Sequence, residues 1–264
     1  MSKEIAILLP YKEKFTNKDA GAASIWVKDY LKKSKLRNKT IVYGNLAKFE
    51  KPITQNFRNI NISKIYIKKN LYYTKKFFQN CVDQQHKIIE IHNRPESLNF
   101  FFEKKKMNNF KLIFVFHNNP LELRGSKTVE ERLNIIKNTD YIFFVSAWVK
   151  NKFFENIAVK ERNNCEVLYP SIEPIKKINK NKKKTIIFTG KLNSSKGYDI
   201  FLEAITKILN KYNSWNAVAV GNEPREKFNV KHDRLKIHNW KTHNEILKLY
   251  DSSSISVVPS KWEE

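Results

Sequence analysis

The sequence predicts an α/β protein with two open parallel β-sheets. Short apolar runs alternate with helical patterns along most of the chain. Some of these runs, such as residues 112–116, are apolar at every position, which is typical of parallel strands covered on both faces. Strand–helix alternation implies right-handed βαβ units. Because a lysine-rich stretch interrupts the alternation at residues 171–184, we expect two α/β domains.

The first predicted domain covers residues 1–170. Its strands are bounded by changes from apolar to polar sequence, and we place them at Ile5–Leu9, Thr40–Tyr43, Lys64–Ile67, Lys87–Ile91, Lys111–Phe116, Tyr141–Val145 and Glu166–Tyr169. Its helices show apolar residues at helical spacing, and we place them at Ala22–Lys33, Tyr72–Val82, Glu96–Lys105, Thr128–Asn138 and Ala147–Asn156.

Residues 171–184 are predicted to form an interdomain linker. The segment follows Pro170, contains Pro174 and has few apolar residues before a dense run of lysines. A polybasic patch that binds anionic lipid is the alternative interpretation of the same lysines. One segment could serve both purposes.

The second predicted domain covers residues 185–264 and repeats the alternation. Thr242 followed by Glu245 is a capping-box pattern and predicts the start of the last helix. We place strands at Thr185–Thr189, Asn216–Val220, Leu235–Asn239 and Ile255–Val258, and helices at Gly197–Tyr212 and Asn244–Asp251.

The chain is strongly basic. It has 50 Lys and Arg against 26 Asp and Glu, a formal charge of +24. Such a charge attracts polyanions, among them anionic lipid head groups, phosphorylated glycans and nucleic acid. Abundant Lys, Asn and Ile would also follow from a compositional bias of the coding sequence. No nucleic-acid-binding module is recognisable, so we expect no nucleic acid partner.

Several classes of protein are disfavoured by the sequence. Only two cysteines, Cys81 and Cys165, are present, which argues against a disulfide scaffold and fits a reducing cytosol. Neither a signal peptide nor a membrane-spanning window is evident. The motifs of serine hydrolases, zinc proteases and P-loop enzymes are missing, and the histidines show no metal-ligand spacing. We therefore expect a cytoplasmic protein, with peripheral attachment to the inner face of the membrane left open.

Glycine turns at strand–helix junctions indicate anion binding. Gly21 precedes the first helix, whose amino terminus favours an anion, although small residues there also permit close helix packing. Gly190 and Gly221 each follow a strand. Lys191 and Lys196 lie beside the next helix start and could neutralise a diphosphate without a metal. Solvated surface lysines are the simpler alternative.

Polar residues follow two strands of the first domain. His92, Asn93 and Arg94 come directly after a buried strand, so His92 or Asn93 could contact a sugar hydroxyl. A helix start explains Pro95 equally well. His117 ends the most apolar strand, where a histidine is either functional or a structural hydrogen-bonding group.

Two further segments contain charged residues that could bind a ligand. Arg124 and Lys127 flank a glycine and would suit a phosphate or carboxylate on an acceptor, or form a mobile basic loop. The segment 259–264, which ends in Glu264, places carboxylates after the last predicted strand.

These motifs together resemble those of a known family. The donor-domain landmarks of family 4 retaining glycosyltransferases are matched, in order and spacing, by FTGKLNSSKG, AVAVGNEP and LKIHNWKTHNEILKLYDSSSISVVPSKWEE. The segments EIHNRPES, VFHNNPLELRGSKTVEER and FFVSAWVKNKFF resemble a bacterial subgroup that acts in lipopolysaccharide and surface polysaccharide assembly. The resemblance implies the GT-B fold, in which two Rossmann-like, doubly wound domains face a cleft.

The resemblance also implies roles for individual residues. Lys191 and Lys196 match the basic pair that binds the donor diphosphate, although the first is usually Arg. His117 matches the strand-end histidine that approaches the transferred sugar, and Gly21 matches the glycine loop near the diphosphate. Glu264 matches the first carboxylate of the E-x7-E motif. Because the second carboxylate would lie beyond residue 264, we expect a truncated donor domain.

The implied reaction is the transfer of a sugar from a nucleoside-diphosphate sugar to a glycan or lipid-linked acceptor, with retention of anomeric configuration. The family generally uses no metal or other cofactor. The alternative hypothesis is an inactive, truncated fragment that binds anionic glycans or a membrane surface.

The diphosphate assignment makes a first prediction. Lys196→Ala should lower transfer activity more than Lys182→Ala, because Lys182 lies in the predicted linker. Equal losses in the two variants, measured as initial rates, would contradict the assignment.

Overall fold

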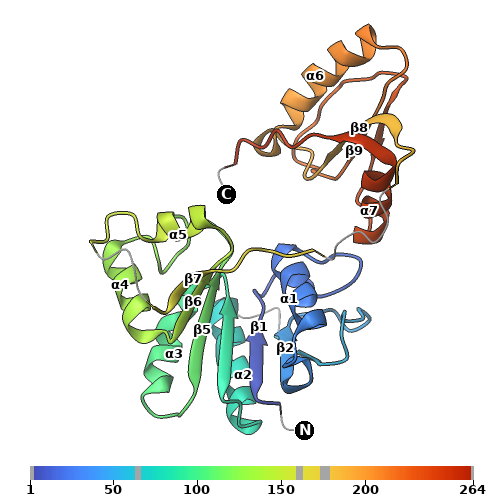
Figure 1. Ribbon diagram of the computed structural model, residues 1–264. Helices are drawn as coiled ribbons and strands as arrows, with labels where there is room; N and C mark the ends of the chain where they lie inside the picture. The colour runs from blue at the N-terminus through green and yellow to red at the C-terminus, as the bar shows by residue number, and fades with distance from the viewer. Residues whose placement is uncertain (1–2, 63–66, 159–162, 173–178, 263–264) are drawn as a thin grey trace. The chain divides into compact units, whose positions relative to one another are not determined.

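The computed structural model describes residues 3–62, 67–158, 163–172 and 179–262. The chain divides into two compact units, an amino-terminal unit Met1–Glu173 and a carboxy-terminal unit Pro174–Glu263. Each unit contains one parallel sheet with helices packed on it (Figure 1).

The sheet of the amino-terminal unit has seven strands in the order β3-β2-β1-β4-β5-β6-β7. All neighbouring strands are parallel. The order runs outward from β1 in both directions, as in a doubly wound fold. The strands are β1 (Ile5–Leu8), β2 (Thr40–Gly44), β3 (Phe57–Asn59), β4 (Ile88–His92), β5 (Lys111–Phe116), β6 (Tyr141–Phe144) and β7 (Cys165–Val167).

Helices cover both faces of this sheet. One face packs against α1 (Ala22–Lys33) through a cluster that contains Trp26 and Val27. The opposite face carries the larger apolar cluster, which includes side chains from α2 (Lys69–Asp83), α3 (Leu98–Lys105), α4 (Val129–Asn138) and α5 (Ala147–Phe153). Strand β1 contributes alternate residues to the two clusters, which explains why it is apolar throughout.

The carboxy-terminal unit has a four-stranded parallel sheet in the order β10-β9-β8-β11. Its core joins β8 and β9 to the apolar side of α6, where Phe188 packs on Phe201. The elements are β8 (Lys183–Thr189), α6 (Tyr198–Lys211), β9 (Asn216–Val220), β10 (Leu235–His238), α7 (His243–Ser252) and β11 (Ser253–Ser256). The predicted capping box of Thr242 and Glu245 begins α7.

Some predicted boundaries were wrong. Strand β11 begins two residues earlier than expected, because α7 ends at Ser252 and the chain pairs with β8 at once. Strand β8 likewise begins at Lys183, inside the predicted linker. The short edge strand β3 was missed because its sequence, Phe-Arg-Asn, is mostly polar and exposed. The strand predicted at residues 64–67 falls largely outside the described residues.

Three-residue 3₁₀ turns precede several elements, at Arg37–Lys39, Pro95–Ser97 and Ser194–Lys196. Among the described residues, every helix is too short or too polar to cross a membrane.

A buried arginine holds three segments of the amino-terminal unit together. Arg132 on α4 is 2% exposed. Its guanidinium donates to the carbonyl oxygens of Ser126 (3.4 Å), Lys127 (2.9 Å) and Glu155 (2.6 Å). Burial lowers the pKa of Arg132, because the lost hydration outweighs the opposing effect of the Glu155 and Glu131 charges. The loop before α4 is therefore tied to the turn after α5 by hydrogen bonds from one guanidinium group to backbone oxygens.

Replacement of this arginine should destabilise the fold. Arg132→Met keeps the apolar stem but leaves buried carbonyl oxygens unsatisfied, so we expect a loss of about 2–4 kcal/mol in the free energy of unfolding. Urea unfolding curves measure the loss. Lys137→Met, at an exposed position of the same helix, is the control and should change stability by less than about 0.5 kcal/mol. Similar losses of stability in Arg132→Met and Lys137→Met would show that the hydrogen bonds of Arg132 do not stabilise the fold.

Candidate functional site

The order of the strands locates one candidate region in each unit. Ligands of open α/β sheets bind beyond the carboxyl ends of the strands, where connections leave to opposite sides. In the amino-terminal unit this switch point lies between β1 and β4, and in the carboxy-terminal unit it lies between β8 and β11. Most predicted site residues follow strands at or next to these points.

The turn before α1 is occupied by a carboxylate of the protein itself. Gly21 is the N-cap of α1, and the Glu13 Oε1 atom accepts from the Ser24 N–H at 3.0 Å. A Cβ atom on Gly21 would meet Glu13 Oε1 at 2.4 Å, so glycine is required for this approach. The amino terminus of α1 therefore has its anion already, and a diphosphate at Gly21 would have to displace Glu13.

The turn after β4 is held by Asn93 in a left-handed conformation. Asn93 has φ 51°, a region that asparagine tolerates better than most residues. Its Oδ1 atom accepts from the His117 N–H at 3.2 Å and its Nδ2 atom donates to Asn118 Oδ1 at 2.7 Å. Arg94 donates to the Asn93 carbonyl. Asn93 thus uses its side chain to hold the segment after β5, and its predicted contact with a sugar stays a prediction.

Three polar side chains form a chain of hydrogen bonds beneath this turn. Glu90 Oε1 lies 2.7 Å from His92 Nε2, and His92 Nδ1 lies 2.8 Å from His117 Nε2. His92 is 0% exposed, and both its ring nitrogens are bonded inside the protein. His92 was predicted to bind the acceptor, and this prediction was wrong, because no ligand can reach a fully buried ring whose polar atoms are both in use. His117 is the partly exposed end of the chain.

The basic loop after β5 is pinned against the turn after β4. Gly125, at φ 93°, would place a Cβ atom 2.6 Å from the backbone nitrogen of Glu96. Ser126 is fully buried and donates to the Pro120 carbonyl at 2.6 Å. Arg124 and Lys127 remain exposed on either side of these anchors. The structure therefore brings the loops that carry the predicted acceptor residues of two neighbouring strands, β4 and β5, together at one edge of the sheet.

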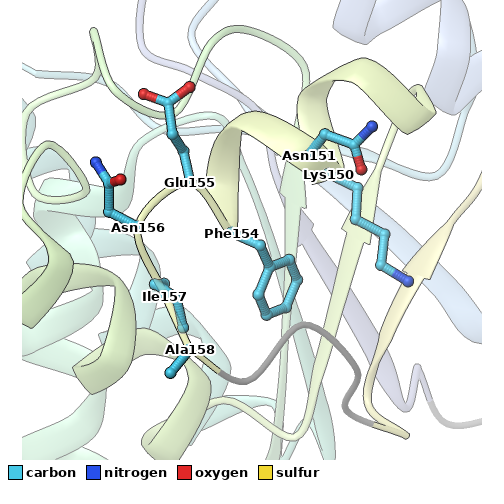
Figure 2. Close-up of a pocket in the computed structure, with 7 residues that line it drawn as sticks. All are labelled: Lys150, Asn151, Phe154, Glu155, Asn156, Ile157 and Ala158. Atoms are coloured by element: carbon cyan, nitrogen blue, oxygen red, sulfur yellow. The ribbon is translucent and has the colours of Figure 1, made fainter.

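Two cavities in the amino-terminal unit differ in whether predicted site residues line them. Figure 2 shows one of about 690 Å³ beside the end of α5, lined by Lys150, Asn151, Phe154, Glu155, Asn156, Ile157 and Ala158. It contains none of the predicted site residues and adjoins residues 159–162, which are not described, so we assign it no function. The other, of about 10 Å³, lies at the β1–β4 switch point beside Tyr73, His92 and Arg94. It has room for about one water molecule.

Glycines bring three loops of the carboxy-terminal unit into contact. A Cβ atom on Gly221 would lie 1.7 Å from the Gly190 carbonyl oxygen, so the turns after β8 and β9 touch. Gly197, at φ 69°, would place a Cβ atom 1.9 Å from the Pro259 carbonyl oxygen. The Lys261 N–H also donates to the Ser195 carbonyl at 3.0 Å. The loops that follow β8 and β11 are thus joined at the switch point.

Lys191 and Lys196 lie in these loops. Lys191 is exposed, and its charge helps to lower the pKa of Glu223. Lys196 ends the 3₁₀ turn whose N-cap is Asn193, and Asn193 Oδ1 accepts from the Lys196 N–H at 3.0 Å. The structure places the two lysines in one loop before α6, as the sequence predicts. Glu264 lies outside the described residues, and its predicted contact with the donor stays a prediction.

Lys182 proves unsuitable as a neutral comparison. Its ammonium donates to the carbonyl oxygens of Tyr250, Asp251 and Ser253 at 3.1–3.3 Å. These groups surround the carboxyl end of α7, where a cation stabilises the helix dipole. Lys182→Ala would therefore disturb the carboxy-terminal unit, and an exposed lysine such as Lys207 is the better control.

Sequence reasoning overlooked two carboxylates in these regions. Glu90 is an acidic residue inside an otherwise apolar strand, Ile-Ile-Glu-Ile, and this contrast is a signal that could have found it. Glu13 lies in an irregular segment, and nothing in the local sequence marks its bond to α1. Among the described residues, no group of three His, Cys, Asp or Glu side chains is arranged to hold a metal ion.

Residues 171–264 match a family model described as "Glycosyl transferases group 1". The carboxy-terminal part of the chain is therefore similar to the group 1 glycosyl transferases. The match includes Lys191, Lys196 and the three glycines whose contacts join the loops. No curated protein matches the chain in sequence.

Solved structures share the fold over almost the whole chain, which confirms the predicted GT-B fold. Sucrose-phosphate synthase from Thermosynechococcus elongatus is 14% identical with a TM-score of 0.69, and the match covers 98% of this chain and 76% of that one. Anabaena HepE in complex with UDP and glucose is 13% identical with a TM-score of 0.67, covering 99% and 75%. A glycosyltransferase from Rickettsia africae is 14% identical with a TM-score of 0.65, covering 100% and 74%.

The loop after β9 in the carboxy-terminal unit contains an unusually acidic glutamate. Arg225 donates from Nε and from its terminal nitrogen to the two Glu223 carboxylate oxygens, each at 2.7 Å. This paired bond lowers the pKa of Glu223 to about 2. The carboxylate therefore stabilises the loop fully above its ordinary pKa, and this contribution is lost as the pH falls through about 2.

A titration tests this geometry. We expect the Glu223 carboxyl ¹³C resonance to titrate with a midpoint near 2, and Arg225→Gln should move it toward 4.5. Lys227→Gln removes a neighbouring exposed cation and should leave the midpoint nearly unchanged. An ordinary midpoint in the unaltered protein would show that the pair does not form.

Proposed function

We propose that this protein transfers a sugar from a nucleoside-diphosphate sugar to a hydroxyl group of an acceptor, with retention of anomeric configuration. The observation that carries the proposal is the loop between β8 and α6, which holds Lys191 and Lys196 at the switch point of a unit similar to the group 1 glycosyl transferases. The fold is shared with a protein solved in complex with UDP and glucose, so UDP-sugars are the first donors to test.

The lysines supply the attraction for a diphosphate in this proposal. The first turn of α6 already contains Asp199, whose carboxylate accepts from Lys261 at 2.6 Å. A carboxylate of the protein itself therefore already lies at the positive end of the α6 dipole. Lys191 and Lys196 carry the charge that would stabilise a diphosphate leaving group as its bond to the sugar breaks.

The amino-terminal unit would bind the acceptor and the transferred sugar. His117 is partly exposed, and Arg124 and Lys127 are exposed on a loop that close contacts hold against the turn after β4. Two exposed cations suit an acceptor that carries phosphate or carboxylate, such as an anionic glycan or a lipid-linked saccharide. The charge of +24 would also favour peripheral contact with an anionic membrane.

Calorimetry with UDP, GDP and ADP tests the donor site. One nucleotide should bind, and Lys196→Ala should weaken that binding about tenfold or more, since a charge-assisted hydrogen bond is lost. Lys191→Ala should act in the same direction. Lys207→Ala is the matched control, because Lys207 is exposed on α6 and pairs with Glu203 of the same helix face.

The outcomes separate the proposed function from its alternative. Binding of one nucleotide, lost in Lys196→Ala and kept in Lys207→Ala, supports the donor site. If no nucleotide binds while anionic vesicles or sulfated glycans do, the polyanion-binding alternative is favoured. Proton NMR of the anomeric position in the product then tests retention.

A further inference from the structure

The chain of hydrogen bonds from Glu90 to His117 lies wholly within the amino-terminal unit. Glu90 and His92 are two residues apart on β4, and Val115 and His117 are two apart along β5 and its end. Both pairs face the side of the sheet that α1 covers. Trp26 of α1 packs edge-on against His92 at 5.5 Å and against His117 at 5.8 Å between ring centroids.

Hydrogen-bond chemistry restricts the proton positions along this chain. An ionised Glu90 carboxylate can only accept, so His92 must carry a proton on Nε2. In a neutral His92, Nδ1 then accepts from His117, so the His117 proton is on Nε2. The Nδ1 atom of His117 is left with its lone pair and has no protein partner among the described residues. The Glu90 carboxylate thereby determines which ring nitrogen of His117 carries the proton, although two hydrogen bonds separate the two residues.

Burial keeps the His117 end of this chain neutral. Glu90 is 7% exposed and His92 is 0% exposed. Burial, and then the neighbouring His92, hold the pKa of His117 well below its ordinary value, so the ring is neutral at neutral pH. Tyr30 is the titratable group that faces Glu90 from α1, and burial and then the Glu90 charge raise its pKa, so it stays neutral too.

We propose that Glu90 and His92 are positioning residues that fix the tautomer of His117, so that His117 Nδ1 accepts a hydrogen bond from a hydroxyl group of the bound sugar or acceptor. The inference rests on the proposed function for the identity of the ligand, but the tautomer itself does not. The alternative proton arrangement requires either a protonated Glu90 or a charged His92, and it would turn His117 into a donor at Nδ1.

The lone pair on His117 Nδ1 would discriminate between ligands by their hydrogen-bonding groups. A ring nitrogen with a lone pair favours a hydroxyl donor and disfavours a group that can only accept, such as an ether oxygen or a fluorine substituent. His117 would be the residue that touches the ligand. Glu90 and His92 would act only through it.

Nitrogen NMR of ¹⁵N-histidine-labelled protein tests the tautomers without any ligand. Signals are assigned with His92→Gln and His117→Gln, and His86, which is bonded to Tyr43 and the Lys3 carbonyl, serves as a buried reference outside the chain. At pH 7.5 we expect both His92 and His117 to carry their proton on Nε2. A His117 proton on Nδ1 in the unaltered protein would overturn the proposal.

Glu90→Gln provides the second arm, because it keeps the shape and removes the charge. We expect a mixture of His117 tautomers, an unchanged His86 signal, and a fall in kcat of about tenfold with little change in KM for the donor. Glu203→Gln, on the exposed face of α6, is the matched control and should change neither readout.

The two arms distinguish the possible failures. Unchanged tautomers and an unchanged kcat in Glu90→Gln would refute the positioning role while leaving the transfer activity intact. Expected tautomers in a protein that neither binds nor turns over any nucleotide-sugar would refute the proposed function and support only the proton arrangement.

Discussion

The structure depends on one constraint, which is that a strand covered on both faces can hold polar side chains only where they are bonded to one another. In the amino-terminal unit this leaves the carboxyl ends of the strands as the place for chemistry. Glu90 and His92 are the exception within β4, and their bonds to each other and to His117 make the exception tolerable. The buried pair lies beside the half-exposed histidine that the function would use.

Close backbone contacts give the loops their positions. Gly125 against Glu96 joins the loops after β4 and β5, while Gly190 against Gly221 and Gly197 against Pro259 join those of the carboxy-terminal unit. Each contact excludes a Cβ atom, and three of these four glycines also have a positive φ that other residues rarely adopt. The basic residues nearby are therefore presented from loops with defined shapes, and a site built from them needs little ordering when a ligand binds.

The protein supplies its own anions at two helix starts. Glu13 bonds to the first turn of α1, and Asp199 lies in the first turn of α6. A helix amino terminus next to a glycine is therefore insufficient evidence for a phosphate site, since a carboxylate of the same chain can occupy that position. In the carboxy-terminal unit, Lys191, Lys196 and the family match support a diphosphate site. In the amino-terminal unit, the glycine turn at Gly21 is weak evidence for one.

The sequence by itself determined the fold class, the two-unit organisation and most elements, because apolar runs and helical spacing are local properties of the chain. It also placed Lys191 and Lys196 in one loop, since they are only five residues apart. Tertiary structure alone decided that His92 is buried, that Asn93 holds the His117 segment, and that Lys182 caps α7. These outcomes depend on which strand lies beside which and on the direction of each side chain, and contacts between residues far apart in sequence leave no periodic pattern from which to predict them.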